Sequence, residues 1–146
     1  MFVIEEARDE ADREVCFRIR FAVFVDEQGV PEEEELDAHD ETALHLIAMA
    51  DGRAVGTARA VPFEGGSKIG RVAVLPSARG KGLGAALVRC LVDRAEREDL
   101  PHVVLDAQMD AMGFYERLGF VAEGGMFDDA GIPHRRMRLV LPAGKS

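Results

Sequence analysis

The sequence lacks any apolar run that approaches the roughly 20 residues of a membrane-spanning helix. Glu5, Glu6 and Arg8 interrupt the N-terminus before the apolar core of a signal peptide could form. No internal repeat, low-complexity tract or linker-like segment divides the chain, and its 146 residues fit one domain, residues 1–146. We therefore expect a single cytoplasmic domain with no membrane partner, as a monomer or homodimer.

Cysteine is scarce, and its two residues, Cys16 and Cys90, both lie on apolar helix faces. That placement favours reduced core thiols over a disulfide or a nucleophile, and a reducing compartment. We predict no metal site.

An excess of basic residues is also missing, since the formal net charge is −9. Residues 26–41 contain nine carboxylates and no Lys or Arg, so the remainder of the chain is formally neutral. Nucleic-acid binding needs a basic face, and we predict no nucleic-acid partner. The acidic segment is either a solvated loop or one wall of a site that attracts a cationic molecule.

The most informative stretch present is RGKGLG, Arg79 to Gly84. It follows the strand-like run IGRVAVL and precedes a helix, beginning near Gly82, whose apolar residues recur at helical spacing. A helix start offers unpaired N–H groups and partial positive charge, and glycines there let phosphates approach the backbone. With the added charges of Arg79 and Lys81, residues Arg79, Gly80, Lys81, Gly82, Leu83 and Gly84 predict a pyrophosphate cradle.

The remaining elements follow the order β-α-β-β-β-α-β-α-β-β, which indicates an α/β sheet with a helix after the central strand. The predicted elements are strand 2–6, helix 8–25, strands 43–50 and 53–61 joined at Asp51-Gly52, strand 69–75, the cradle helix, strand 102–107, helix 110–118, and strands 120–123 and 135–140. Between the first helix and strand 43–50, the acidic segment is expected to be loop or broken helix.

A competing motif is the dinucleotide fingerprint Gly80-x-Gly82-x-x-Ala85, with Asp106 at the end of the following strand. Five residues separate Val74 from Gly80, whereas that fingerprint turns tightly off its strand. Only 40 residues follow Asp106, too few for the rest of such a fold. These spacings disfavour a nicotinamide or flavin enzyme.

Two blocks of the sequence resemble the GNAT superfamily of acyl-CoA-dependent N-acetyltransferases. Arg79, Gly82 and Gly84 match its cofactor motif, and QMDAMGFYERLGF, residues 108–120, is similar to its second block. Val23 to Pro31 and Gly131 to His134 resemble a small bacterial, ElaA-like subgroup. The resemblance implies a mixed, mostly antiparallel sheet flanked by helices, whose central strands splay to admit the pantetheine arm of acetyl-CoA.

The resemblance also implies roles for individual residues. Val72 and Val74 would contact the cofactor at the splay, the Val74 N–H would face the thioester carbonyl, and Gln108, where the family often has Asn, would also touch the cofactor. Tyr115, the single tyrosine, occupies the family's general-acid position, and a phenol stays protonated at neutral pH.

The general base is left open, because Lys68 stands where some relatives place a glutamate. The candidates are Glu27, Asp37, His39, His45 and His134, or water alone. Of these we predict Glu27 as catalytic and Asp37 and His134 as substrate-binding, whereas His45 lies within an apolar strand, as core histidines do.

These observations predict direct transfer of an acetyl group from acetyl-CoA to a primary amine of a small molecule or protein, with a cationic acceptor favoured. One alternative is an acyltransferase that uses another acyl carrier, resembling acyl-homoserine-lactone synthases, whose pattern Arg20, Val23 and Phe24 faintly echo. The other is a CoA-binding module without catalysis.

Overall fold

The structure is a computed structural model, and it describes residues 2–142 as one seven-stranded sheet with helices on both faces. The sheet order is β1-β2-β3-β4-β5-β7-β6, in which β4 and β5 are parallel and every other neighbouring pair is antiparallel. The strands are β1 (Phe2–Glu6), β2 (Leu44–Ala50), β3 (Arg53–Phe63), β4 (Gly66–Val74), β5 (His102–Gln108), β6 (Val121–Asp129) and β7 (Ile132–Val140). The α-helices are α1 (Glu10–Arg20), α2 (Glu32–Glu35), α3 (Leu83–Arg97) and α4 (Met112–Arg117).

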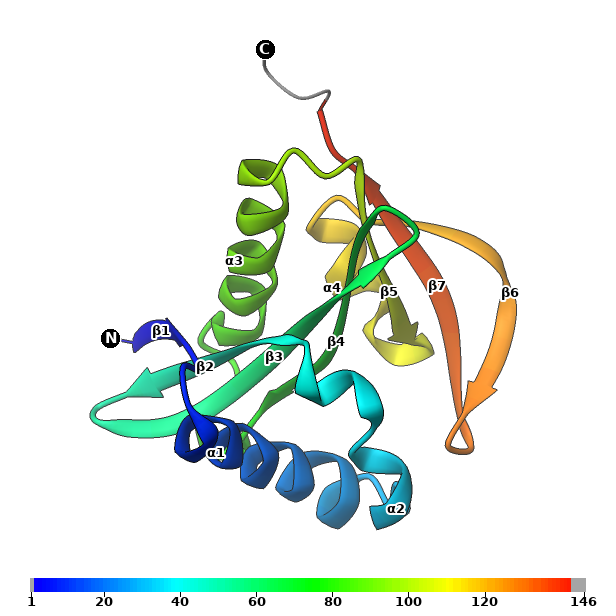
Figure 1. The fold of residues 1–146 in the computed structure, drawn as a ribbon. Coiled ribbons are helices and arrows are strands. Elements are labelled where there is room, and N and C mark those ends of the chain that lie inside the picture. The colour runs from blue at the N-terminus through cyan, green and yellow to red at the C-terminus, as the bar shows by residue number, and fades with distance from the viewer. Residues whose placement is uncertain (1, 143–146) are drawn as a thin grey trace.

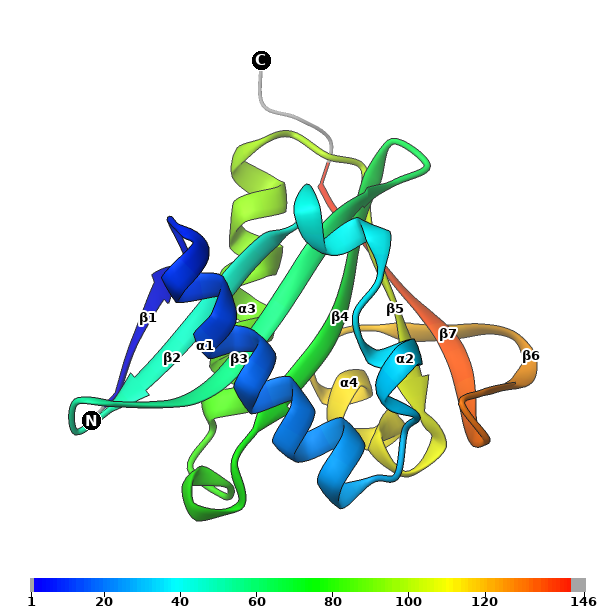
Figure 2. The same ribbon diagram turned by 60° about the horizontal axis from the view of Figure 1, so that its bottom comes forward.

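Helices α1 and α3 cover opposite faces of the sheet, as Figures 1 and 2 show. The apolar face of α3 packs into the larger core through Leu83, Leu87 and Leu91, which are almost fully buried. On the other face, Ile19 and Val23 pack against Ala73 of β4. The sheet thus separates two cores, and both predicted amphipathic helices are confirmed. Cys16 is buried, Cys90 is half-buried, and both are free thiols.

Tight turns fix two hairpins, β2–β3 at the predicted place and β3–β4. Asp51 and Gly52 have φ of 51° and 78°, and Glu64 and Gly65 have φ of 50° and 83°. Two successive residues with positive φ match the right-handed twist of the flanking strands, which sets the registers of β2–β3 and β3–β4.

The predicted first helix continues beyond α1 in a different form. After Arg20 the chain forms a π-helix over Phe21–Glu27, rather than the α-helix predicted through residue 25. Periodicity could not distinguish the two, because the segment is too short and too apolar for a 3.6-residue repeat to stand out: in the structure Val23 is buried and Phe21 is exposed. π-helical turns are rare and often mark functional sites. The acidic segment is broken helix, as expected: α2, then a 3₁₀ turn over Ala38–Glu41.

The C-terminal hairpin is longer than predicted. Strand β6 runs to Asp129 and not to residue 123, and β7 begins at Ile132 and not at residue 135. Gly124, Gly125 and Pro133 obscured these ends in the sequence, since both residue types are unusual within strands. Pro133 is accommodated because β5 pairs with β7 only as far as His134. In Figure 1 this hairpin curves away from the rest of the sheet.

No helix within residues 2–142 is both long enough and apolar enough to cross a bilayer. In the same residues, no three His, Cys, Asp or Glu side chains are grouped so that they could hold a metal ion.

Candidate active site

The central feature of the site is the parting of β4 from β5. The two strands pair only from Ser67 to Ile69, opposite Val103 to Leu105, and then diverge. The splay therefore starts earlier than residues 72–74. Figure 2 shows the gap opening toward the C-terminal ends of both strands. The backbone of β4 beyond Ile69 is left without a strand partner on that side.

A bulge in β4 accompanies the parting. Thr57 pairs with Ala73 and Arg59 pairs with Gly70, so Arg71 and Val72 together oppose Ala58 alone. Arg71 has φ of 52°, a left-handed conformation that is unusual for arginine. Bulges re-aim the side chains and backbone groups of a strand and are frequent beside active sites.

The peptide groups of Val72 and Val74 face the gap. The N–H of Leu75 donates to the carbonyl of Val55 on β3, and successive residues of a strand direct their peptide groups to alternate sides. The carbonyl of Val74 accepts instead from Arg79 Nε at 2.9 Å. Val72 and Val74, the two predicted cofactor contacts, therefore have accessible backbone groups.

The glycine-rich stretch forms the start of α3, as predicted. Gly80 and Gly82 have φ of 80° and 81°, and Gly82 caps the helix. A Cβ atom added at either glycine would meet no other atom within 4 Å, so the space above the helix start is open. Unpaired N–H groups, positive dipole and open space together suit the diphosphate of a CoA molecule.

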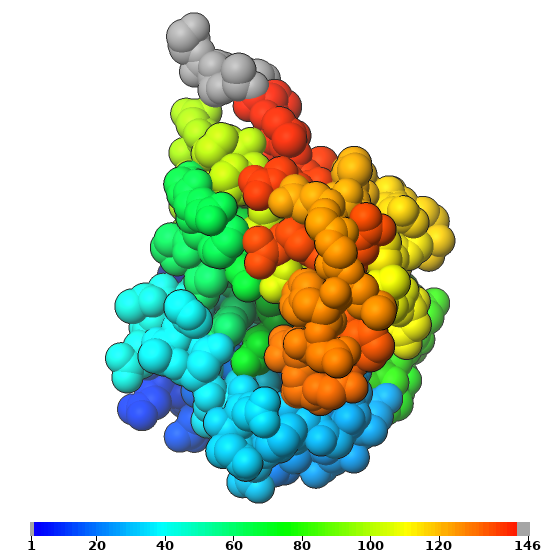
Figure 3. Space-filling model, turned by 90° about the vertical axis from the view of Figure 1, so that its right-hand side faces the viewer, coloured from blue at the N-terminus to red at the C-terminus, as the bar shows by residue number. Residues whose placement is uncertain are grey.

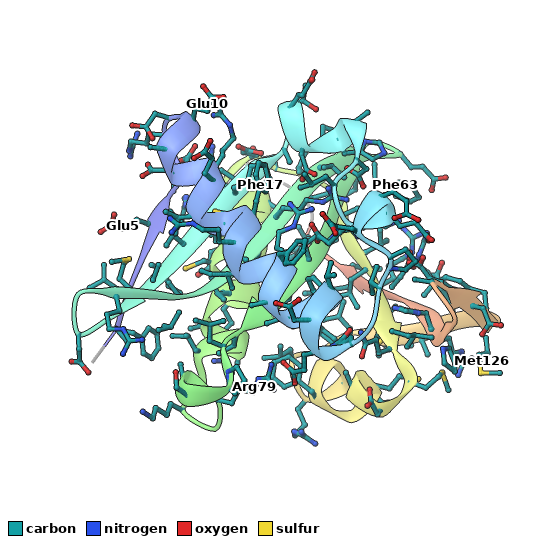
Figure 4. The ribbon with its side chains drawn as sticks, turned by 90° about the horizontal axis from the view of Figure 1, so that it is seen from below. Glu5, Glu10, Phe17, Phe63, Arg79 and Met126 are labelled. Atoms are coloured by element: carbon teal, nitrogen blue, oxygen red, sulfur yellow. The ribbon has the colours of Figure 1, made fainter. Side chains whose placement is uncertain are left out.

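Side-chain contacts cross the mouth of the gap. Arg79 forms a two-pronged ion pair with Glu27 at the end of the π-helix, at 2.6 and 2.7 Å. Gln108 at the end of β5 donates to Gln28 at 2.9 Å. Figure 4 shows Arg79 at the loop that precedes α3. The hydrogen bond from Arg79 lowers the pKa of the exposed Glu27 carboxyl, which makes Glu27 a weaker base.

A cavity of about 490 Å³ lies beside the gap. Figure 3 looks onto this side, where the acidic segment and the β6–β7 hairpin border a hollow with the green β3–β4 region as its floor. The lining includes the sequence-predicted Gln108, Tyr115, His134 and Val72, together with His39 and Glu34. The structure therefore brings together residues from five different parts of the chain.

Tyr115 lies on α4 with its ring packed edge-on against Phe114 and Phe120, at centroid distances of 4.9 and 6.1 Å. Burial raises the pKa of Tyr115 to about 12, and no hydrogen bond contributes to that rise. Within residues 2–142, some fully buried side-chain polar atoms have no hydrogen-bond partner, and the Tyr115 hydroxyl is not one of them. Tyr115 thus combines a fixed ring with a protonated hydroxyl that borders the cavity.

His134 lies on β7 directly opposite Gln108 of β5. Its Nδ1 is 2.7 Å from the carbonyl of Ile132, and its ring stacks on Phe127 at a centroid distance of 6.0 Å. A carbonyl oxygen can only accept, so Nδ1 holds the proton of the neutral ring and Nε2 carries the lone pair. His134 therefore offers a basic nitrogen beside the cavity.

Besides Glu27, three more carboxylates of the acidic segment are paired with arginines instead of standing free. Arg20 is fully buried and donates to Glu35 at 2.9 Å and to Asp40 at 2.7 Å. Burial by itself would raise the pKa of Asp40, but the hydrogen bonds from Arg20 and from the Asp37 N–H hold it well below its usual range.

Asp37 belongs to the same network. It accepts from Arg59 at 2.7 and 2.9 Å and lies 3.4 Å from Arg71. Three arginines thus balance three carboxylates, which leaves Asp37 without an unpaired charge to offer a substrate. Arg20 is one of the residues that weakly resemble the pattern of acyl-homoserine-lactone synthases. In this structure Arg20 is the buried centre of the network.

The two other histidine candidates differ in position. His45 is a buried core histidine, as expected: its Nε2 lies 3.0 Å from the carbonyl of Asp40, and burial lowers its pKa. His39 is exposed on the 3₁₀ turn, at the rim of the cavity.

Sequence reasoning missed the arginines that neutralise the acidic segment. Arg20 and Arg59 each interrupt an otherwise apolar helix or strand face, and that interruption was the available signal. It also passed over Phe63, Lys68 and Asp106 as cavity-lining residues. Asp106 had been considered only as a ribose-binding acid, whereas it pairs with Lys68 and Arg136.

Comparisons with known proteins agree with this geometry. Residues 6–141 match the family described as "Acetyltransferase (GNAT) domain". The uncharacterized N-acetyltransferase YjcF of Bacillus subtilis is 35% identical over 132 residues, which cover 90% of this chain and 94% of that protein.

Among solved structures, an acyl-CoA N-acyltransferase from Pseudomonas aeruginosa superposes with a TM-score of 0.84 at 32% identity, covering 95% of this chain and 98% of that one. Escherichia coli ElaA superposes with a TM-score of 0.84 at 25% identity, covering 95% and 99% of the two chains. A match over nearly the whole chain, with the parted strands and the cradle in place, establishes that this protein is an acyltransferase belonging to the GNAT acetyltransferase family.

Proposed function

We propose that this chain transfers an acetyl group from acetyl-CoA directly to the primary amine of an acceptor bound in the cavity. The observation on which this proposal rests is the combination of an open glycine cradle, a β4 edge without a strand partner beyond Ile69, and a cavity lined by Val72 and Tyr115. When bound, acetyl-CoA supplies the activated thioester. The cradle N–H groups and Lys81 would hold its diphosphate, and Val72 and Val74 would pair with its pantetheine arm.

Tyr115 is proposed as the general acid. Its raised pKa keeps the hydroxyl protonated across the neutral range, so the hydroxyl can donate a proton to the departing sulfur. The N–H of Val74 would donate to the carbonyl oxygen of the thioester, where negative charge develops during attack. These groups lie on the rigid β4 and on α4, which fixes their direction before the acceptor arrives.

His134 is the proposed base, since its Nε2 is the basic nitrogen in the cavity with a defined lone pair. An acceptor enters as an ammonium ion and must lose a proton before it can attack. Glu27 was predicted as a catalytic residue, but its ion pair with Arg79 lies at the mouth of the gap and makes it a weak base. In this proposal Glu27 positions Arg79.

The test measures release of free CoA thiol from acetyl-CoA with a panel of primary amines. We expect thiol release that depends on an amine, and a fall in turnover for His134→Gln with unchanged affinity for acetyl-CoA. CoA binding without any amine-dependent thiol release would favour the non-catalytic module. A preference for long acyl chains over acetyl would favour the acyltransferase that uses another carrier.

A further inference from the structure

A second charged cluster borders the cavity and consists of Lys68, Asp106 and Arg136 around the ring of Phe63. Of these residues, Lys68, Asp106 and Phe63 line the cavity, and Arg136 pairs with Asp106. Lys68 Nζ lies 3.1 Å from one carboxylate oxygen of Asp106, and Arg136 Nε lies 2.5 Å from the other. The two cations are 5.5 and 4.9 Å from the centre of the Phe63 ring. Figure 4 shows Phe63 on the α2 side of the molecule, well separated from Arg79.

This cluster has one more positive than negative charge. Two cations share the single carboxylate of Asp106, and burial, which by itself would raise the pKa of Asp106, is outweighed by the hydrogen bonds from Arg136 and Lys68. The neighbouring Arg138 forms its own pair with Glu123 at 2.7 Å and adds no net charge. The arginine network around Glu35, Asp37 and Asp40 is also neutral, so that network does not cancel the excess at Lys68 and Arg136; Glu34 and Asp129 also line the cavity.

The excess charge is available to a ligand. Lys68, Asp106 and Phe63 line the cavity, and the side chains of Lys68 and Arg136 are 32% and 27% exposed. An ammonium group has three N–H donors, and within residues 2–142 Lys68 forms one ion pair. Two partly desolvated cations beside an aromatic ring are suited to a carboxylate, because charge-assisted hydrogen bonds strengthen as water is excluded.

We propose that the acceptor amine also bears a carboxylate, which Lys68 and Arg136 bind while the amine lies at His134. This inference rests on the proposed function and specifies its substrate class. Arg136 and His134 are two residues apart on β7, about 7 Å along a strand. An extended chain advances roughly 1.25 Å per bond, so about five or six bonds would separate the amine nitrogen from the carboxylate carbon.

The experiment compares matched pairs of acceptors that differ only in the carboxyl group. The series glycine, 4-aminobutanoate, 5-aminopentanoate and 6-aminohexanoate would be assayed beside the corresponding amides by thiol release. We expect kcat/KM to favour the carboxylate on the order of tenfold or more over its amide, with the optimum at 5-aminopentanoate or 6-aminohexanoate. Lys68→Met and Arg136→Gln should each remove most of this preference, mainly through KM, and Lys68→Arg should retain it.

The control is Arg138→Gln, which removes a cation from the same strand but outside the cluster and should leave the preference intact. Equal or better use of the amides, or a preference unchanged in Lys68→Met, would overturn the inference while leaving the acetyltransferase proposal standing. Glycine as the best acceptor would overturn the spacing. Absence of thiol release with every amine would instead refute the proposed function, and this inference with it.

Discussion

Replacement of Tyr115 by phenylalanine tests the proposed acid and its environment together. The ring contacts with Phe114 and Phe120 remain in Tyr115→Phe, and no hydrogen bond is lost with the hydroxyl. We therefore expect unchanged stability at neutral pH and unchanged affinity for acetyl-CoA. Turnover should fall on the order of 10²–10⁴-fold, the usual contribution of a positioned general acid.

The alkaline range provides an independent measurement. Burial raises the pKa of Tyr115 to about 12 from the ordinary value of 10.0 for a phenol, which corresponds to about 3 kcal/mol. Because the pKa in the folded state is the higher one, this contribution is fully present below about pH 10 and is lost as the pH rises toward about 12. The free energy of unfolding should thus fall with pH more steeply in the wild type than in Tyr115→Phe.

The pKa of Tyr115 can be measured by ultraviolet absorbance without interference, because Tyr115 is the single tyrosine and the chain has no tryptophan. The ultraviolet absorbance of tyrosinate then reports on this residue alone, and denaturant titrations of both proteins give the difference in stability. A tyrosinate midpoint near pH 10 in the folded protein would refute the buried environment. Wild-type turnover in Tyr115→Phe would refute the catalytic role.

Four further predictions concern the cradle, the buried network and the acidic segment. Gly82→Val and the control Gly65→Val both place a side chain at positive φ, which should lower the stability of each by roughly 1–2 kcal/mol. Calorimetry should show weakened CoA binding for Gly82→Val alone. Burial alone would raise the pKa of Asp40, but its hydrogen bonds hold that pKa well below its usual range. The free energy of unfolding should therefore fall as the pH drops below about 4. Asp40→Asn should make this pH dependence weaker in acid denaturation. Arg20→Met should destabilise by about 3–5 kcal/mol in urea unfolding, because it removes a buried cation and leaves Asp40 with Arg59 alone and Glu35 with Arg71 alone; a loss below about 1 kcal/mol would contradict the network. If the acidic segment attracts the ammonium group of the acceptor, Glu34→Gln should raise the acceptor's KM at low salt, while Glu33→Gln, which changes an equally exposed carboxylate outside the cavity lining, should not.

The site was only partly predictable from the sequence. The open helix start at the cradle and the place of Tyr115 beside the cavity were predictable because each depends on a short motif with a local physical reason. The contacts that distinguish Glu27 from His134 were not predictable, because they form across the fold: Glu27 meets Arg79, 52 residues away, and His134 lies opposite Gln108 on a neighbouring strand.

The acidic segment shows most clearly what composition leaves undecided. Its nine carboxylates indicated either a solvated loop or one wall of a site for a cationic molecule, but Glu35, Asp37 and Asp40 are neutralised by arginines from α1, β3 and β4. Those partners are between 15 and 36 residues distant in the chain, so no local pattern connects them. The charge of a surface is a sum over neighbours in space, which a linear count cannot supply.

The sequence by itself determined the order of strands and helices, the turns and the glycine cradle, because hydrophobic periodicity, positive φ and helix-start chemistry act over a few residues. The tertiary structure decided where β4 leaves β5, which carboxylates remain free, and that Lys68, Asp106 and Arg136 meet around Phe63. Strand pairing, burial and ion pairing join residues far apart in the chain, and these long-range contacts shape the acceptor side of the cavity.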